Sequence, residues 1–139
     1  MATTTLDMQV IRYLNLFEKI TQVRTKSCFF YNNVLVYAIP AQLISKAIGE
    51  NGKNIKQLSN ILGKKIKVIP EPNGIMDAEK FILDIINPIE IKELKVEGSD
   101  IVITAHRQNK AALIGRNKTR LLELKKILEE NFGKGIRIV

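Results

Sequence analysis

Two glycines three residues apart, Gly49 and Gly52, stand between segments whose apolar residues recur at helical spacing. We expect Gly49 to end one helix with a positive φ angle and Gly52 to open the next helix. The first turn of a helix leaves backbone N–H groups without an intrahelical acceptor, and the positive end of the helix dipole favours an anion there. The turn is therefore a candidate binding site for a phosphate group.

Three lysines, Lys46, Lys53 and Lys56, lie within one helical turn of the glycines and would add positive charge. The alternative is an ordinary corner between two helices, in which the glycines serve only the backbone geometry and the lysines form a solvated face. A chain with this many glycines contains a Gly-x-x-Gly pattern by chance in about one case in two. The motif alone therefore does not decide between the two interpretations.

The chain is basic, and its charge is unevenly distributed. It has 139 residues and carries 22 Lys and Arg against 14 Asp and Glu, a net charge of +8. Residues 1–70 carry a net +7, residues 71–100 a net −5 and residues 101–139 a net +6. Two basic blocks, one of which contains the glycine turn, therefore flank an acidic stretch. This pattern favours nucleic acid or another polyanion as the partner.

Periodicity and turn residues predict the same order of elements in both halves of the chain. In the first half we expect a helix over 6–20, strands over 23–30 and 34–39, helices over 40–48 and 52–63, and a strand over 65–69. In the second half we expect a helix over 77–86, strands over 89–97 and 100–105, helices over 107–114 and up to 132, and a strand over 135–139. The Pro- and Gly-containing segment between them is a linker. We therefore expect two αββααβ domains over 1–70 and 76–139, joined by a linker over 71–75.

The two halves also match residue by residue when the chain is shifted by 66 positions. Ile48, Gly49 and Asn51 then fall on Ile114, Gly115 and Asn117. A four-residue insertion after this point aligns residues 66–69 with residues 136–139. The sequence is therefore consistent with two copies of one unit, although two amphipathic units of this kind share some Ile and Leu through composition alone.

A Gly-x-x-Gly turn between two helices of an αββααβ unit resembles the KH domain in its type II arrangement, whose loop clamps the backbone of about four nucleotides. The tandem arrangement, with Ile-Gly-Glu-Asn-Gly-Lys-Asn-Ile at 48–55 and Ile-Gly-Arg-Asn-Lys at 114–118, resembles the archaeal NusA family. The resemblance covers nearly the whole chain. It implies an α+β fold of two tandem type II KH domains, each a three-stranded mixed sheet covered by helices. It also implies a factor that binds single-stranded RNA and regulates transcription elongation and termination.

The chain departs from the family pattern in three ways. Lys118 replaces the closing glycine of the second turn, so that this turn is not expected to act as a standard clamp. The variable pair of the first turn, Glu50 and Asn51, contains no cation, so nearby lysines must supply the charge. Bacterial members of the family carry an amino-terminal polymerase-binding domain and an OB-fold domain ahead of the KH pair, which have no counterpart here. Contact with RNA polymerase is therefore implied by the resemblance only.

The expected RNA-binding surface combines the two turns, basic groups beside them and an apolar floor for bases. Its residues in the first copy are Lys46, Ile48, Gly49, Glu50, Asn51, Gly52, Lys53, Ile55, Lys56 and Lys67. Its residues in the second copy are Ile114, Gly115, Arg116, Asn117, Lys118, Arg120 and Arg137, with Leu121 in the floor. The alternative for the aliphatic residues is ordinary core packing, and the alternative for the basic residues is a solvated face.

Signals for catalysis are poor, and we expect no enzymatic activity. The single histidine, His106, and the single cysteine, Cys28, do not make a metal site, and no phosphate-loop motif is present, so that we expect neither metal nor cofactor. The lone cysteine, the absence of a signal-peptide pattern and the absence of a long apolar run favour a cytoplasmic protein without membrane contact. We expect a monomer. Two alternatives stay open, a ribosome-associated or RNA-processing KH protein, and a KH scaffold used mainly for protein interaction.

Overall fold

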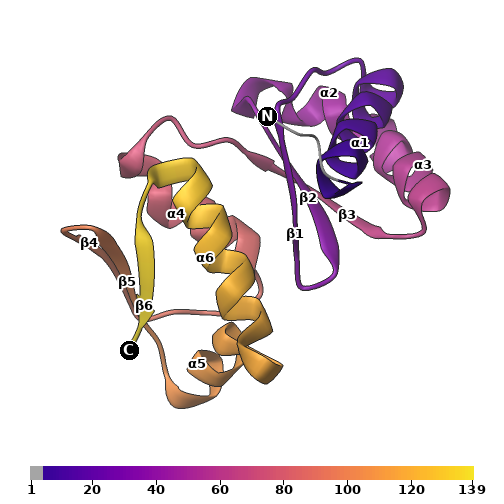
Figure 1. The fold of residues 1–139 in the computed structure, drawn as a ribbon. Helices are drawn as coiled ribbons and strands as arrows, with labels where there is room; N and C mark the ends of the chain where they lie inside the picture. Colours follow the sequence, from indigo (N-terminus) through magenta and orange to yellow (C-terminus); the bar gives the residue numbers. More distant parts are fainter. Residues whose placement is uncertain (1–4) are drawn as a thin grey trace. The chain divides into compact units, whose positions relative to one another are not determined.

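The computed structural model describes residues 5–139, with side chains from residue 8 onward. Within this range it contains six α-helices and two three-stranded sheets, in which each central strand has one parallel and one antiparallel neighbour (Figure 1). The prediction of an α+β fold with three-stranded mixed sheets is confirmed. The chain divides into two compact units, Met1–Glu71 and Pro72–Val139. No helix among the described residues combines the length and apolarity needed to cross a membrane.

The first unit follows the order αββααβ. Its elements are α1 (Thr5–Thr21), β1 (Ser27–Tyr31), β2 (Val34–Ile39), α2 (Ile44–Ile48), α3 (Lys53–Leu62) and β3 (Lys65–Pro70). A short 3₁₀ turn over Ala41–Leu43 precedes α2, where the sequence predicted continuous helix. The hairpin between β1 and β2 turns at Asn32 and Asn33, which both have positive φ, as a two-residue loop between antiparallel strands requires.

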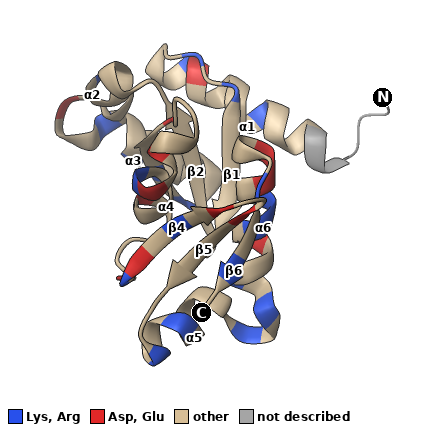
Figure 2. Cartoon of the chain, turned by 90° about the vertical axis from the view of Figure 1, so that its left-hand side faces the viewer, with Lys and Arg blue, Asp and Glu red and all other residues tan. Residues whose placement is uncertain are grey.

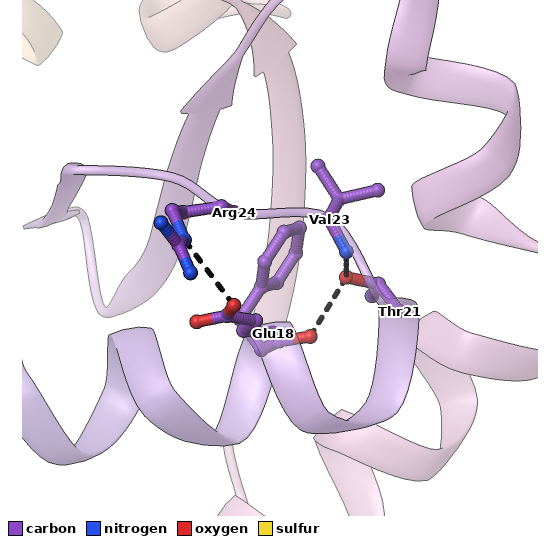
Figure 3. Close-up of polar contacts among 5 residues, drawn as sticks. Glu18, Thr21, Val23 and Arg24 are labelled. Carbon is purple, nitrogen blue, oxygen red and sulfur yellow. Dashed lines mark hydrogen bonds and ion pairs between the residues drawn. The ribbon is translucent and has the colours of Figure 1, made fainter.

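β1 begins four residues later than predicted, because polar contacts tie the preceding segment to the end of α1 (Figure 3). The Thr21 hydroxyl donates to the Phe17 carbonyl oxygen at 2.7 Å and accepts from the Val23 amide at 3.1 Å. Arg24 Nε lies 3.3 Å from Glu18 Oε1. These contacts join Val23 and Arg24 to residues of α1, so this segment does not pair as a strand in the sheet.

The core of the first unit lies between the sheet and its helices. Phe17 of α1 stacks on Tyr37 of β2 with ring centroids 4.2 Å apart, and both side chains are fully buried. The Tyr37 hydroxyl donates to the Tyr13 carbonyl oxygen at 2.9 Å, which satisfies the one polar atom of this ring. Leu58 of α3 joins the same cluster. α3 is thereby held with one face in the core and the opposite face in solvent.

The second unit repeats the order. Its elements are α4 (Ala78–Ile86), β4 (Glu93–Glu97), β5 (Asp100–Thr104), α5 (Arg107–Ile114), α6 (Thr119–Phe132) and β6 (Gly135–Ile138). β4 begins four residues later than predicted, since the Ile89 amide still bonds to the Ile86 carbonyl oxygen and residues 87–92 connect the helix to the sheet.

The register of the two sheets supports the internal repeat and locates its insertion. Lys67 pairs with Val36 in the first sheet, and Arg137 pairs with Val102 in the second. Val36 and Val102 are 66 residues apart, whereas Lys67 and Arg137 are 70 residues apart. The four additional residues lie in α6, which has 14 residues against the 10 of α3. Four residues make about one further helical turn, so the insertion lengthens the helix and preserves the pairing of the strand that follows.

Candidate nucleic-acid interface

The first glycine turn connects α2 to α3 and contains three residues with positive φ. Gly49 has φ 80° and ψ 171°, Asn51 has φ 55° and ψ 28°, and Gly52 has φ 72° and ψ 20°. The Gly52 amide bonds back to the Gly49 carbonyl oxygen at 3.2 Å and closes the turn. The predicted positive φ at Gly49 is confirmed. Gly52 is the residue directly before α3, in the left-handed conformation that glycine adopts without strain.

The second turn has the same backbone shape although its last residue is a lysine. Gly115 has φ 73° and ψ 172°, Asn117 has φ 57° and ψ 28°, and Lys118 has φ 61° and ψ 22°. The Lys118 amide bonds to the Gly115 carbonyl oxygen at 3.2 Å, as in the first turn. The replacement of the closing glycine by Lys118 therefore leaves the backbone shape of the turn unchanged, and the expectation that this turn does not act as a standard clamp stays a prediction. The two turns differ in their side chains at two positions, where Arg116 replaces Glu50 and Lys118 replaces Gly52.

The first glycine of each turn is required by close packing against the following helix. A Cβ atom on Gly49 would lie 2.9 Å from Asn54 Nδ2 and 3.2 Å from the Asn54 backbone nitrogen. A Cβ atom on Gly115 would lie 2.6 Å from Arg120 Cγ and 3.1 Å from the Arg120 backbone nitrogen. Gly52 is different, because a Cβ atom there would meet only Lys56 Cε, at 4.0 Å.

Asn54 is a residue of this site that the sequence reasoning missed. Its Nδ2 donates to the Lys46 carbonyl oxygen of α2 at 3.3 Å, so that one side chain connects the two helices across the turn. In the second turn the Thr119 hydroxyl donates to the Arg116 carbonyl oxygen at 2.6 Å. A polar residue within two positions of the end of each turn was the available signal.

The amino-terminal ends of α3 and α6 are not capped by side chains among the described residues. Gly52 and Lys118 occupy the capping positions, and neither makes a side-chain cap hydrogen bond. The first amide of each helix bonds back within its turn, from Lys53 to the Glu50 carbonyl oxygen and from Thr119 to the Arg116 carbonyl oxygen. The turn thus lies at the positive end of the helix dipole, without a side-chain cap to cover it. Both turns therefore offer the backbone environment that a phosphate oxygen requires.

A groove runs from the first turn along the exposed face of α3, and we call it the α3 groove. It consists of two adjoining hollows of about 530 Å³ each, which share Lys56 and Asn60. The first hollow is lined by Glu50, Asn51, Lys53, Lys56, Gln57, Asn60 and Ile61. The second lies between α3 and β3 and is lined by Ile55, Lys56, Ser59, Asn60, Lys65 and Ile66. Gln57, Ser59, Asn60 and Lys65 were not among the predicted site residues.

The predicted cations of the first copy divide into two groups. Lys46, Lys53 and Lys56 are exposed and make no ion pair with any residue that the structure describes, so their charge is available to a ligand. Lys67 lies elsewhere, because its neighbours Ile66 and Val68 pack on the helix-covered core and side chains alternate along a strand. Lys67 therefore projects from the sheet face opposite the helices, and Arg137 occupies the equivalent register position in the second sheet.

In the second copy, Arg116, Asn117 and Lys118 are exposed at the turn. Arg120 is half-buried, and its side chain packs against Gly115. Its Nη1 lies 3.7 Å from Glu123 Oε1, so its positive charge is partly neutralised. Figure 2 shows further Lys and Arg residues in blue on α5 and α6.

The side chains of the predicted apolar floor are only partly exposed to a ligand. Ile48, Ile55, Ile114 and Leu121 are each partly exposed. Ile55 packs against the core and also lines the α3 groove. It can therefore contribute to both core packing and contact with a base.

Among residues 5–139, no three His, Cys, Asp or Glu side chains are grouped as metal ligands.

Comparison with known proteins gives a consistent set of archaeal relatives. A protein of Methanococcus vannielii named "Probable transcription termination protein NusA" is 31% identical over 114 residues, which are 79% of this chain and 64% of that protein. Proteins of the same name from Methanocaldococcus jannaschii and Halococcus morrhuae are 28% and 22% identical, over 94% and 92% of this chain and 72% and 92% of their own lengths. The chain thus spans about two thirds of the length of the first two relatives. No family model matches the chain.

A solved structure titled "Crystal structure of APE1850" has a similar fold. It superimposes with a TM-score of 0.64 at 26% identity, over 93% of this chain and 96% of that chain. The similarity therefore extends over both units.

Proposed function

Because this chain belongs to the NusA family of these archaeal relatives, we propose that it is an RNA-binding factor of transcription termination and elongation, built from two tandem type II KH domains. Each unit has the element order αββααβ and a turn between two helices, as the KH assignment requires. The role in transcription termination is taken from the names of the relatives. Single-stranded RNA is the proposed ligand, and RNA polymerase is a second proposed partner through the family.

The observation that carries this proposal is the shared shape of the two turns. The three positive-φ positions of the two turns have φ and ψ angles within about 11° of each other, although the side chains differ at two of the four turn positions. Each turn lies at a helix amino terminus without a side-chain cap, and each has exposed cations beside it. A backbone-centred site of this kind binds the phosphates of a flexible single strand, since it recognises no base in itself.

The test is a titration of a labelled 12-nucleotide single-stranded RNA, followed by fluorescence anisotropy at several salt concentrations. If about four to six phosphates are neutralised, log K falls against log[salt] with a slope of roughly −3 to −4, or about 100-fold between 50 and 200 mM salt. A duplex of the same sequence is expected to bind more weakly, because its paired bases cannot enter the α3 groove. Tight binding that ignores salt, or a preference for the duplex, would contradict the proposal.

Matched variants locate the binding surface. Lys53→Gln combined with Lys56→Gln removes two cations beside the first turn and should make the salt slope less steep by roughly 1.4. Lys26→Gln is the control, because Lys26 is an exposed lysine of the same unit that lies outside the α3 groove. An intact fold without RNA binding would favour the alternative of a scaffold for protein interaction.

A further inference from the structure

We propose that the two units divide the work of RNA recognition: the α3 groove discriminates between bases, whereas the corresponding face of α6 holds the strand through its phosphates regardless of sequence. This inference rests on the proposed RNA-binding function and assigns different roles to its two halves. It follows from comparing residues that the repeat makes equivalent.

The equivalence of α3 and α6 is fixed at both ends by the structure. The turns that precede them superpose residue by residue at an offset of 66, and Leu58 and Leu124 are both fully buried at the matching position. The extra turn of α6 lies beyond this part of the helix. Gln57, Ser59 and Asn60 of α3 are therefore equivalent to Glu123, Lys125 and Lys126 of α6, respectively.

The α3 groove carries side chains suited to base edges. Gln57 and Asn60 are exposed, line the groove and make no hydrogen bond within the part of the chain that the structure describes. A carboxamide has both donors and an acceptor, so it distinguishes bases by the pattern of donors and acceptors on their edges. Ile55 and Ile61 supply apolar surface on either side of these amides. The groove thus combines apolar contact with directional polar contact.

The matching face of α6 offers charge in place of these amides. The Gln57 counterpart, Glu123, faces Arg120 at 3.7 Å and has acceptors only. The Asn60 and Ser59 counterparts, Lys126 and Lys125, are exposed ammonium groups, which act as flexible point charges. Point charges contact phosphates without discriminating between bases. This face therefore adds affinity and salt dependence, and little sequence preference.

The experiment measures the binding of four labelled RNAs, 12-nucleotide oligo(A), oligo(C), oligo(U) and a mixed sequence, by the full chain and two variants. The first variant, Gln57→Ala with Asn60→Ala, should reduce the spread of Kd across the four RNAs to about twofold and leave the salt slope unchanged. The second, Lys125→Ser with Lys126→Asn, introduces the unit-1 residues. It should weaken all four RNAs by a similar factor and make the slope less steep by roughly 1.4. All four side chains are exposed, so the thermal midpoint of each variant checks that folding is retained.

The outcomes separate this inference from the function on which it rests. If the parent binds none of the four RNAs, the proposed function fails. If the parent binds all four equally well, RNA binding stands and the division of roles is overturned. The division is also overturned if the alanine variant keeps the parent's sequence preference, or if the lysine variant changes that preference.

Discussion

The first glycine of the first turn should be far less replaceable than the second. Gly49→Ala places a methyl group in a region of φ and ψ that is essentially restricted to glycine, which costs about 1–3 kcal/mol. The methyl group also displaces the Asn54 side chain from its hydrogen bond to the Lys46 carbonyl oxygen, which costs a further ~0.5–1.5 kcal/mol. We expect Gly49→Ala to lower the free energy of unfolding of the first unit by about 2–4 kcal/mol.

Gly52→Ala should be much milder. Its Cβ would meet no atom closer than 4.0 Å, so only the left-handed backbone opposes it, at about 1–2 kcal/mol. The lower conformational entropy of alanine in the unfolded chain returns roughly 0.4–1 kcal/mol. The net loss should be about 1 kcal/mol. Gly63→Ala is the matched control, since Gly63 is left-handed at the other end of α3 and its Cβ would also enter open space.

Urea unfolding followed by tyrosine fluorescence measures these differences in the correct unit. The chain has no tryptophan, and its three tyrosines, Tyr13, Tyr31 and Tyr37, all lie in the first unit. With an m-value of about 1–2 kcal/mol/M, Gly49→Ala should lower the midpoint by about 2 M, and each of the other two variants by about 0.5–1 M. Equal shifts for Gly49→Ala and Gly52→Ala would refute the argument that contact with Asn54 makes Gly49 indispensable.

Three further predictions concern the turns and the half-buried thiol of Cys28. Glu50→Asp combined with Asn51→Asp adds one negative charge at the first turn and should weaken single-stranded RNA binding at least about fivefold in an anisotropy titration, with the thermal midpoint nearly unchanged. Lys118→Gly removes a cation but relieves a left-handed lysine, so it should change RNA affinity little and raise the free energy of unfolding by up to about 1 kcal/mol; loss of RNA binding would make the second turn the principal site. Burial raises the pKa of Cys28 to about 11, so the alkylation rate of the folded chain should keep rising with pH toward that value, and its stability should fall over the same range; a rate that levels off near pH 9 would contradict this.

The sequence predicted those elements whose boundaries depend on local signals. The strand over 34–39 and the helix over 107–114 have the predicted bounds, because an Asn-Asn turn, a proline and a glycine mark their ends. β1 and β4 each begin four residues late. For β1 the cause is a set of side-chain contacts to α1, centred on Thr21, which alternation of apolar residues cannot reveal.

The site was predictable where it depends on backbone geometry and was missed where it depends on packing. The glycine pattern located both turns correctly between helices. Gln57 and Asn60 escaped notice because their exposure depends on which face of α3 the sheet and α1 cover. Lys67 was grouped with the turn on charge alone, whereas strand parity directs it to the opposite face of the sheet. A polar residue of an amphipathic helix therefore needs the tertiary contacts of its neighbours before a role can be assigned to it.

The two turns have the same residue, glycine, at the first position, where a side chain would clash. They differ at the last position, where there is room for a side chain. Gly49 and Gly115 lie so close to the following helix that a Cβ atom at either position would collide with Asn54 or Arg120. Gly52 faces open space, and Lys118 shows that a side chain fits the equivalent backbone. The fold therefore requires the first glycine, whereas a second glycine matters only to a ligand that approaches the turn closely. On this argument the replacement of the second glycine leaves the shape of the turn intact and changes what the turn presents, from bare backbone in the first unit to an ammonium group in the second.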